Sequence, residues 1–97
     1  MNYYNFNEEL IIGSNILNKY KGLDLILIDM QEYIGPLTMQ YLPYGGIQSV
    51  YAYNLIIHFK NGYFKPCEII YNGKEISVKD FIIQNTDLVN TILGMEE

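Results

Sequence analysis

Residues 49–77, SVYAYNLIIHFKNGYFKPCEIIYNGKEIS, decide the fold. Apolar and aromatic residues alternate along residues 49–60, which is typical of a strand with one buried face. Asn61-Gly62 and Asn72-Gly73 favour two-residue hairpin turns, because a type I′ turn needs a positive φ at both central residues. The stretch therefore predicts a meander of three antiparallel strands at residues 49–60, 63–71 and 74–77.

A two-residue turn at Asn61-Gly62 also predicts the strand register. It places Phe59 opposite Phe64, His58 opposite Lys65 and Ile57 opposite Pro66. In that register Ile57 and Pro66 form a non-hydrogen-bonded pair, so the missing N–H of the proline points away from the first strand. Both faces of the meander carry apolar side chains, which indicates that neither face is fully solvated.

Outward from the meander, residues 8–21 have the spacing of a helix. Asn7 is a suitable N-cap, and Gly22 is a suitable C′ residue. The apolar side of this helix would hold Phe6, Leu10, Gly13, Leu17 and Tyr20. The alternative for residues 11–15 is a strand followed by a turn.

The other segments complete the expected fold. Residues 23–30 are apolar on both parities and suit a strand covered on both faces, while residues 31–46 are irregular, with short strands at 33–34 and 37–42. Residues 78–93 suit a helix capped by Ser77, with an interruption at 85–87 and an end at Gly94. We expect one small α+β domain over residues 1–97. It has an N-terminal helix, a mostly antiparallel sheet of about four to five strands ending in the meander, and a C-terminal helix.

Composition restricts the possible partners. The net charge is −5, and the six basic residues are all lysines. Without arginine, an acidic chain is poorly suited to nucleic acid or anionic membranes, so we expect neither as a partner. One cysteine cannot form an internal disulfide, and the first residues show no signal-peptide pattern, so we expect a cytoplasmic protein.

Few residues could carry catalysis or bind a metal. His58 and Cys67 are the one possible nucleophile–base pair, although a packed thiol and a surface histidine explain them as well. Asp24, Asp29 and Glu32 could form a carboxylate cluster, but Asp24 and Asp29 have opposite parity in a strand and are better explained as solvated strand ends. We therefore expect no enzyme, no metal site and no cofactor.

Half of the ten tyrosines lie within about twenty residues, and this is the candidate binding feature. Tyrosine is enriched in binding surfaces, because its large ring freezes few rotatable bonds. Compositional bias toward AT-rich codons is the alternative explanation. The candidate binding residues are Tyr33, Tyr41, Tyr44, Tyr51 and Tyr53.

These features predict a small, non-enzymatic protein that binds another protein and forms a homo-oligomer, most simply a dimer. In size, acidity and tyrosine content the chain is similar to small inhibitors that phages and mobile elements direct against host defences, a similarity of composition alone. The alternative is an oligomer that sequesters a nucleotide-like small molecule, with tyrosine rings stacking on the base.

Overall fold

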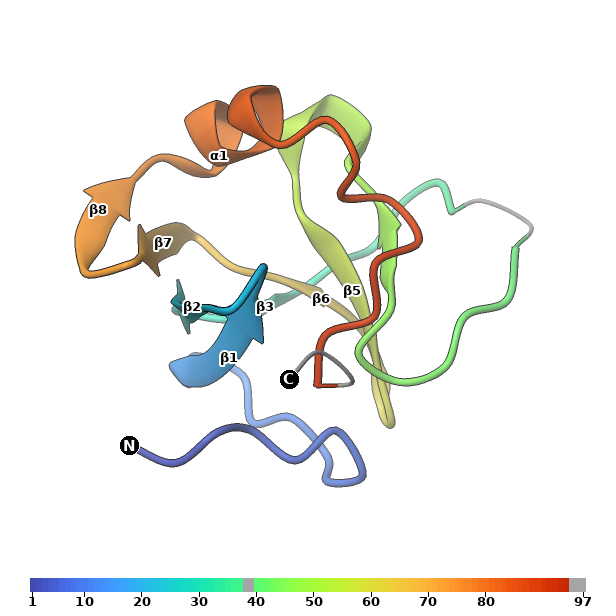
Figure 1. Cartoon of the computed structure of the whole chain (residues 1–97). Coiled ribbons are helices and arrows are strands. Elements are labelled where there is room, and N and C mark those ends of the chain that lie inside the picture. Colours follow the sequence, from blue (N-terminus) through green and yellow to red (C-terminus); the bar gives the residue numbers. More distant parts are fainter. Residues whose placement is uncertain (38–39, 95–97) are drawn as a thin grey trace.

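Two antiparallel sheets of four strands each make up most of residues 1–37 and 40–94, the part of the chain that the computed structural model describes (Figure 1). The first sheet has the order β1 (Ile16–Tyr20), β2 (Leu23–Ile28), β7 (Glu68–Tyr71) and β8 (Lys74–Ile76). The second has the order β3 (Gln31–Glu32), β6 (Gly62–Lys65), β5 (Ile56–Phe59) and β4 (Ile47–Ser49). A 3₁₀ turn, η1 (Tyr51–Tyr53), joins β4 to β5, and helix α1 (Val78–Gln84) follows β8.

The two sheets are joined at a corner where two paired strands bend together. The β2–β7 and β3–β6 ladders keep one register, from Ile28 opposite Glu68 to Gln31 opposite Lys65. Within that register Met30 lies opposite Pro66, which has no N–H to offer. The N-terminal turn replaces this partner, because the N–H of Met30 donates to the carbonyl of Ser14 and its carbonyl accepts from Gly13. The proline thus lies at the break between the sheets.

The expected N-terminal helix is wrong. Residues 16–20 form strand β1, with alternate residues buried, and the turn Lys21-Gly22 has φ values of 52° and 77°, as a type I′ hairpin requires. Gly13 has a φ of 84° and lies in a turn. The helical spacing of the apolar residues was coincidental, and the expected α+β fold is replaced by a mostly sheet fold whose one α-helix among the described residues is α1.

The meander is right in its second turn and wrong in its first. Asn72 and Gly73 both have positive φ and join β7 to β8 as predicted. The first hairpin instead turns at Lys60-Asn61, so His58 lies opposite Tyr63 and Ile57 opposite Phe64. Asn61 is committed elsewhere: its side-chain amide accepts from the N–H of Leu10 at 2.9 Å and donates to its carbonyl at 3.0 Å.

The three expected strands are also divided between the two sheets. Residues 51–53 leave the strand to form η1, and the second strand bends at Pro66 into β6 and β7. A strand at residues 23–28 is confirmed, whereas residues 33–34 are not in a strand. The expected strand at 37–42 falls partly on residues 38–39, outside the described residues.

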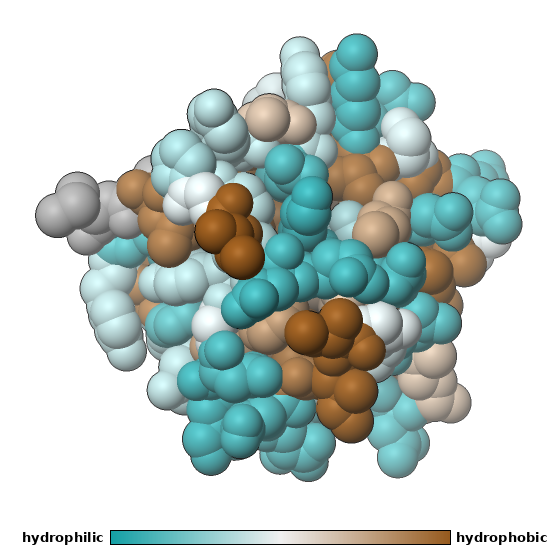
Figure 2. Space-filling model, turned by 180° about the vertical axis from the view of Figure 1, so that it is seen from behind, coloured by the Kyte–Doolittle hydropathy of each residue, from teal (hydrophilic) through white to brown (hydrophobic). Residues whose placement is uncertain are grey.

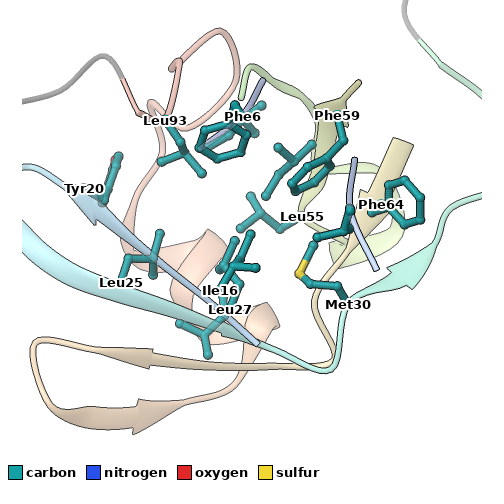
Figure 3. Close-up of a cluster of buried hydrophobic side chains, with 14 of the residues drawn as sticks. Phe6, Ile16, Tyr20, Leu25, Leu27, Met30, Leu55, Phe59, Phe64 and Leu93 are labelled. Atoms are coloured by element: carbon teal, nitrogen blue, oxygen red, sulfur yellow. The ribbon is translucent and has the colours of Figure 1, made fainter. Parts of the chain in front are cut away.

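The core lies between the two sheets (Figure 3). Each sheet contributes its inward parity, and residues before β1 and after α1 complete the cluster. The side chains labelled in Figure 3 are Phe6, Ile16, Tyr20, Leu25, Leu27, Met30, Leu55, Phe59, Phe64 and Leu93. At one end, Phe81 of α1 packs against Tyr20 and Tyr71, with ring centroids 5.7 and 5.3 Å away.

The C-terminal helix begins where the sequence predicts and ends early. Ser77 caps it by accepting from the N–H of Asp80 at 3.0 Å. The helix ends at the expected interruption, with Asn85 as its C-cap, and does not continue to residue 93. The following segment runs along the free edge of β4, where the N–H of Ile47 donates to Thr91 and its carbonyl accepts from Asn90. The N-terminal segment covers the edge of β1 in the same way, through the N–H of Tyr4 and the carbonyl of Leu17.

Candidate functional site

His58 is at the centre of the candidate site, on the outward face of β5. Its neighbours in the strand, Ile57 and Phe59, point into the core and are fully buried. The strand alternation therefore turns the imidazole outward. There it stacks on the ring of its register partner, Tyr63, with centroids 4.7 Å apart and planes 16° apart.

The loop before β4 folds over this same face. Gly45 and Gly46 bring its backbone against β5, where the N–H of Gly45 donates to the carbonyl of His58 and the N–H of His58 donates to the carbonyl of Gly46. A Cβ atom at Gly45 would lie 2.4 Å from the carbonyl oxygen of Leu93, and one at Gly46 would lie 2.6 Å from the Cβ of Leu42. The glycine pair is therefore required for close approach of the backbone.

The loop brings two more rings to His58. The centroid of Tyr44 lies 5.1 Å from the imidazole and that of Tyr41 lies 6.0 Å from it, both edge-on. We call Tyr41, Tyr44, His58 and Tyr63 the aromatic cluster. Tyr41 is 80% exposed and Tyr44 is 40% exposed, whereas His58 and Tyr63 are half-buried. The cluster is therefore a surface of supported rings, open to a partner.

A hydrogen bond from the imidazole anchors the loop. His58 Nδ1 lies 2.7 Å from the carbonyl oxygen of Leu42. Because a carbonyl oxygen only accepts, Nδ1 must carry the proton, and Nε2 of the neutral ring is left as an acceptor. Leu42 itself is buried, as is Ile56 on the outward parity of β5, and neither belongs to the main core. The loop thus has an apolar seat of its own.

The five predicted tyrosines fall into two groups. Tyr41 and Tyr44 belong to the aromatic cluster, and the backbone N–H of Tyr33 donates to the carbonyl of Tyr63 at its edge. Tyr51 and Tyr53 instead lie in η1, beside α1, and are about half exposed (Figure 1).

Sequence reasoning missed Tyr63 and treated His58 as part of a different pair. The signal that would have found both is the hairpin register. A turn placed at Lys60-Asn61 puts the imidazole directly opposite the tyrosine ring.

His58 and Cys67 have no described partner in common. The ring contacts of His58 are those of the aromatic cluster, whereas Cys67 lies at the corner between the sheets, near Asp29 and Lys65. Partial desolvation and the Asp29 carboxylate raise the pKa of the Cys67 thiol above its usual value. A thiol that keeps its proton is a weak nucleophile.

The three carboxylates are likewise separate in their contacts. Asp24 accepts from the hydroxyl of Tyr3 at 2.5 Å, Asp29 accepts from Gln31 at 2.6 Å, and Glu32 is exposed on β3. Among the described residues no group of three His, Cys, Asp or Glu side chains is placed to bind a metal.

Three surface hollows accompany these features, and none of them contains His58. The largest, about 650 Å³, lies along β7 and β8 and is lined mainly by isoleucines together with Glu68 and Glu75. A second, about 470 Å³, is lined by Tyr3, Lys19 and Asp24 among others. The third, about 290 Å³, lies between Tyr44 and the N-terminal segment.

Comparisons of the chain with protein-family models, with curated proteins and with solved structures found no match. Within residues 1–37 and 40–94, the helices are all too short or too polar to cross a membrane.

Proposed function

We propose that this protein binds another protein through the aromatic cluster and acts without catalysis, as an inhibitor of its partner. The observation that carries the proposal is the position of Tyr41, which is 80% exposed yet lies 6.0 Å from an anchored imidazole. Protein-binding hot spots are enriched in tyrosine, and they lie where neighbouring groups exclude water. Tyr44 and Tyr63 provide such neighbours here.

The ordering of the loop also supports this function. Two backbone hydrogen bonds join Gly45 and Gly46 to His58, and the imidazole binds Leu42. A loop that is already ordered loses less conformational entropy when it binds, so more of the contact energy remains as affinity. An exposed aromatic group without such anchors would lose part of that energy to ordering.

A nucleotide-like ligand is less well supported as the target. The hollow that combines a tyrosine with a lysine is the one at Tyr3 and Lys19, and there the lysine lies over the tyrosine ring while Asp24 holds its hydroxyl. A carboxylate at this position would repel a phosphate. The aromatic cluster is an exposed surface, which suits a protein partner better than a small molecule.

Three further expectations belong to this proposal: a homodimer, a cytoplasmic location, and no use of nucleic acid or membrane as partner. The dimer must use a limited surface. On the face seen in Figure 2 the hydrophobic side chains form separate patches divided by a hydrophilic band, so no broad apolar surface is present there. We therefore expect a dimer interface with a polar rim around small apolar patches.

Two paired variants test the proposed function. Tyr41→Ala with Tyr44→Ala should weaken partner affinity by about 2–4 kcal/mol, because it removes two aromatic anchors. The matched control is Tyr51→Ala with Tyr53→Ala, which removes two tyrosines of similar exposure from η1. Native mass spectrometry of each protein purified from its own host measures the retained partner, and the same spectrum gives the stoichiometry of the dimer. Retention of the partner by the Tyr41/Tyr44 variant at the wild-type level would contradict the proposal.

A further inference from the structure

The tyrosines elsewhere on this surface show how the chain uses exposed rings. The ammonium group of Lys19 lies 5.4 Å from the ring centroid of Tyr3, and that of Lys79 lies 5.1 Å from the ring of Tyr53. Lys21 lies 5.3 Å from the ring of Tyr20. Each distance is within the range of a cation–π contact, in which the negative face of the ring attracts a positive charge.

The aromatic cluster differs from these rings in one respect. Among the described residues, no lysine lies over Tyr41, Tyr44 or Tyr63. Lys65 lies two residues from Tyr63 on the same face of β6, but its ammonium group donates to Asn54 Oδ1 at 3.3 Å. The cluster therefore has ring faces available for a cation from outside the chain.

The imidazole adds an acceptor to these ring faces. Because Nδ1 of His58 donates to Leu42, the neutral ring presents Nε2 as a lone pair. An incoming group that has both a positive charge and N–H donors would satisfy both features. Arginine fits best, because its planar guanidinium group stacks on aromatic rings while its N–H groups donate in the plane.

The charge of the whole chain favours the same partner. Eleven carboxylates against six lysines give a net charge of −5, so the protein attracts a cationic partner at long range. The chain has no arginine of its own. A second copy therefore cannot supply the guanidinium group, and the arginine must come from a different protein.

We propose that the aromatic cluster binds an arginine side chain of the partner protein, with the guanidinium group stacked on the rings of Tyr41 and Tyr44 and donating to His58 Nε2. This inference deepens the proposed function and rests on it for its biological meaning. The recognition itself is a property of the cluster, so it can be tested without the partner.

The test is an NMR titration of the isotope-labelled protein with two acetylated tripeptide amides, Gly-Arg-Gly and Gly-citrulline-Gly. Citrulline keeps the shape and most of the donors of arginine and removes its charge. We expect the arginine peptide to shift the signals of Tyr41, Tyr44, His58 and Tyr63, and to bind about threefold to tenfold more tightly than the citrulline peptide. Equal affinity for the two peptides, or shifts located elsewhere, would overturn the inference.

Two variants of one ring separate π attraction from apolar contact. Tyr41→Phe keeps the ring face and should keep the affinity for the arginine peptide, whereas Tyr41→Leu keeps apolar area alone and should lower it about threefold. Tyr51→Leu, in η1, is the control and should bind the peptide as the wild type does. If Tyr41→Leu binds as tightly as Tyr41→Phe, the cluster does not recognise the cation through its rings.

The outcomes also distinguish this inference from the proposed function. Partner capture that depends on Tyr41 and Tyr44, together with equal binding of both peptides, would overturn the arginine proposal and leave protein binding intact. Arginine-selective binding, together with partner capture unaffected by the Tyr41/Tyr44 variant, would overturn the proposed function and leave the recognition of arginine.

Discussion

At the scale of single residues, Asn18 is the clearest departure from good core design. It lies on the inward face of β1 opposite Leu25 and is 2% exposed. Neither its Nδ2 nor its Oδ1 has a hydrogen-bond partner among the described residues. A buried polar group without a partner costs about 1–3 kcal/mol, because it loses its hydrogen bonds to water and gains none.

We therefore predict that Asn18→Leu raises the free energy of unfolding by about 1–2 kcal/mol, since leucine has a similar shape and needs no partner. Urea unfolding followed by circular dichroism measures the change. Asn18→Asp is the control and should be strongly destabilising, because it buries a charge instead of an amide. A leucine variant less stable than the wild type would mean that the amide is satisfied in solution.

At the scale of elements, η1 holds its backbone in an unfavourable conformation. Ala52 and Tyr53 have φ values of 53° and 59°, in the left-handed region that residues with a side chain rarely adopt. Local hydrogen bonds hold the turn: the N–H of Tyr53 donates to Val50 and that of Asn54 donates to Tyr51. The turn keeps Tyr51 and Tyr53 outward at a cost in backbone energy.

Ala52→Gly should relieve part of this strain. Glycine adopts a positive φ freely, although it also adds entropy to the unfolded chain, so the net gain in stability should be about 0.5–1 kcal/mol. Ala52→Val is the opposite control, because a β-branched residue is least tolerant of this conformation. Thermal unfolding of the three proteins should rank them Gly, Ala, Val from most to least stable, and any other order would contradict a strained turn.

The turns also show how far the sequence predicts the fold. Asn72-Gly73 and the Ser77 cap were predictable because local chemistry alone decides them. Lys21-Gly22 is an equally local hairpin, yet the apolar spacing around it also fits a helix, and the spacing misled the prediction. Asn61 was not predictable, because it contacts Leu10, which is distant in the sequence.

The candidate site follows the same division. The tyrosine-rich loop could be recognised from composition, and Tyr41 and Tyr44 do lie together on the surface. The positions of His58 and Tyr63 beneath it depend on the register of the β5–β6 hairpin, and therefore on Asn61. Residues of one loop could be predicted as a group, whereas the strand residues that support them could not.

At the scale of the whole molecule, the segment after α1 is tied to the first hairpin. The hydroxyl of Tyr20 donates to Asp87 Oδ1 at 3.1 Å, and the ammonium group of Lys21 donates to the same oxygen at 3.3 Å. Lys21 and Asp87 are both exposed, so their ion pair contributes little to stability. Tyr20 is different, because its ring is 2% exposed and packs on Phe81.

This buried phenol predicts loss of stability at alkaline pH. Burial, followed by the hydrogen bond to the Asp87 carboxylate, raises the pKa of Tyr20 above its ordinary value of 10.0. The unfolded chain thus releases the phenol proton more readily than the folded protein does. The contribution of Tyr20 to stability is fully present below the unfolded pKa and is lost as the pH rises through the folded pKa. Tyr20→Phe removes this ionisation, so its unfolding free energy should fall less than that of the wild type between about pH 8 and about pH 11. Tyr51→Phe, which removes a phenol from an exposed side chain, should follow the wild type. Urea unfolding of the three proteins at both pH values gives the comparison, and parallel losses in wild type and Tyr20→Phe would show that other groups cause the alkaline transition.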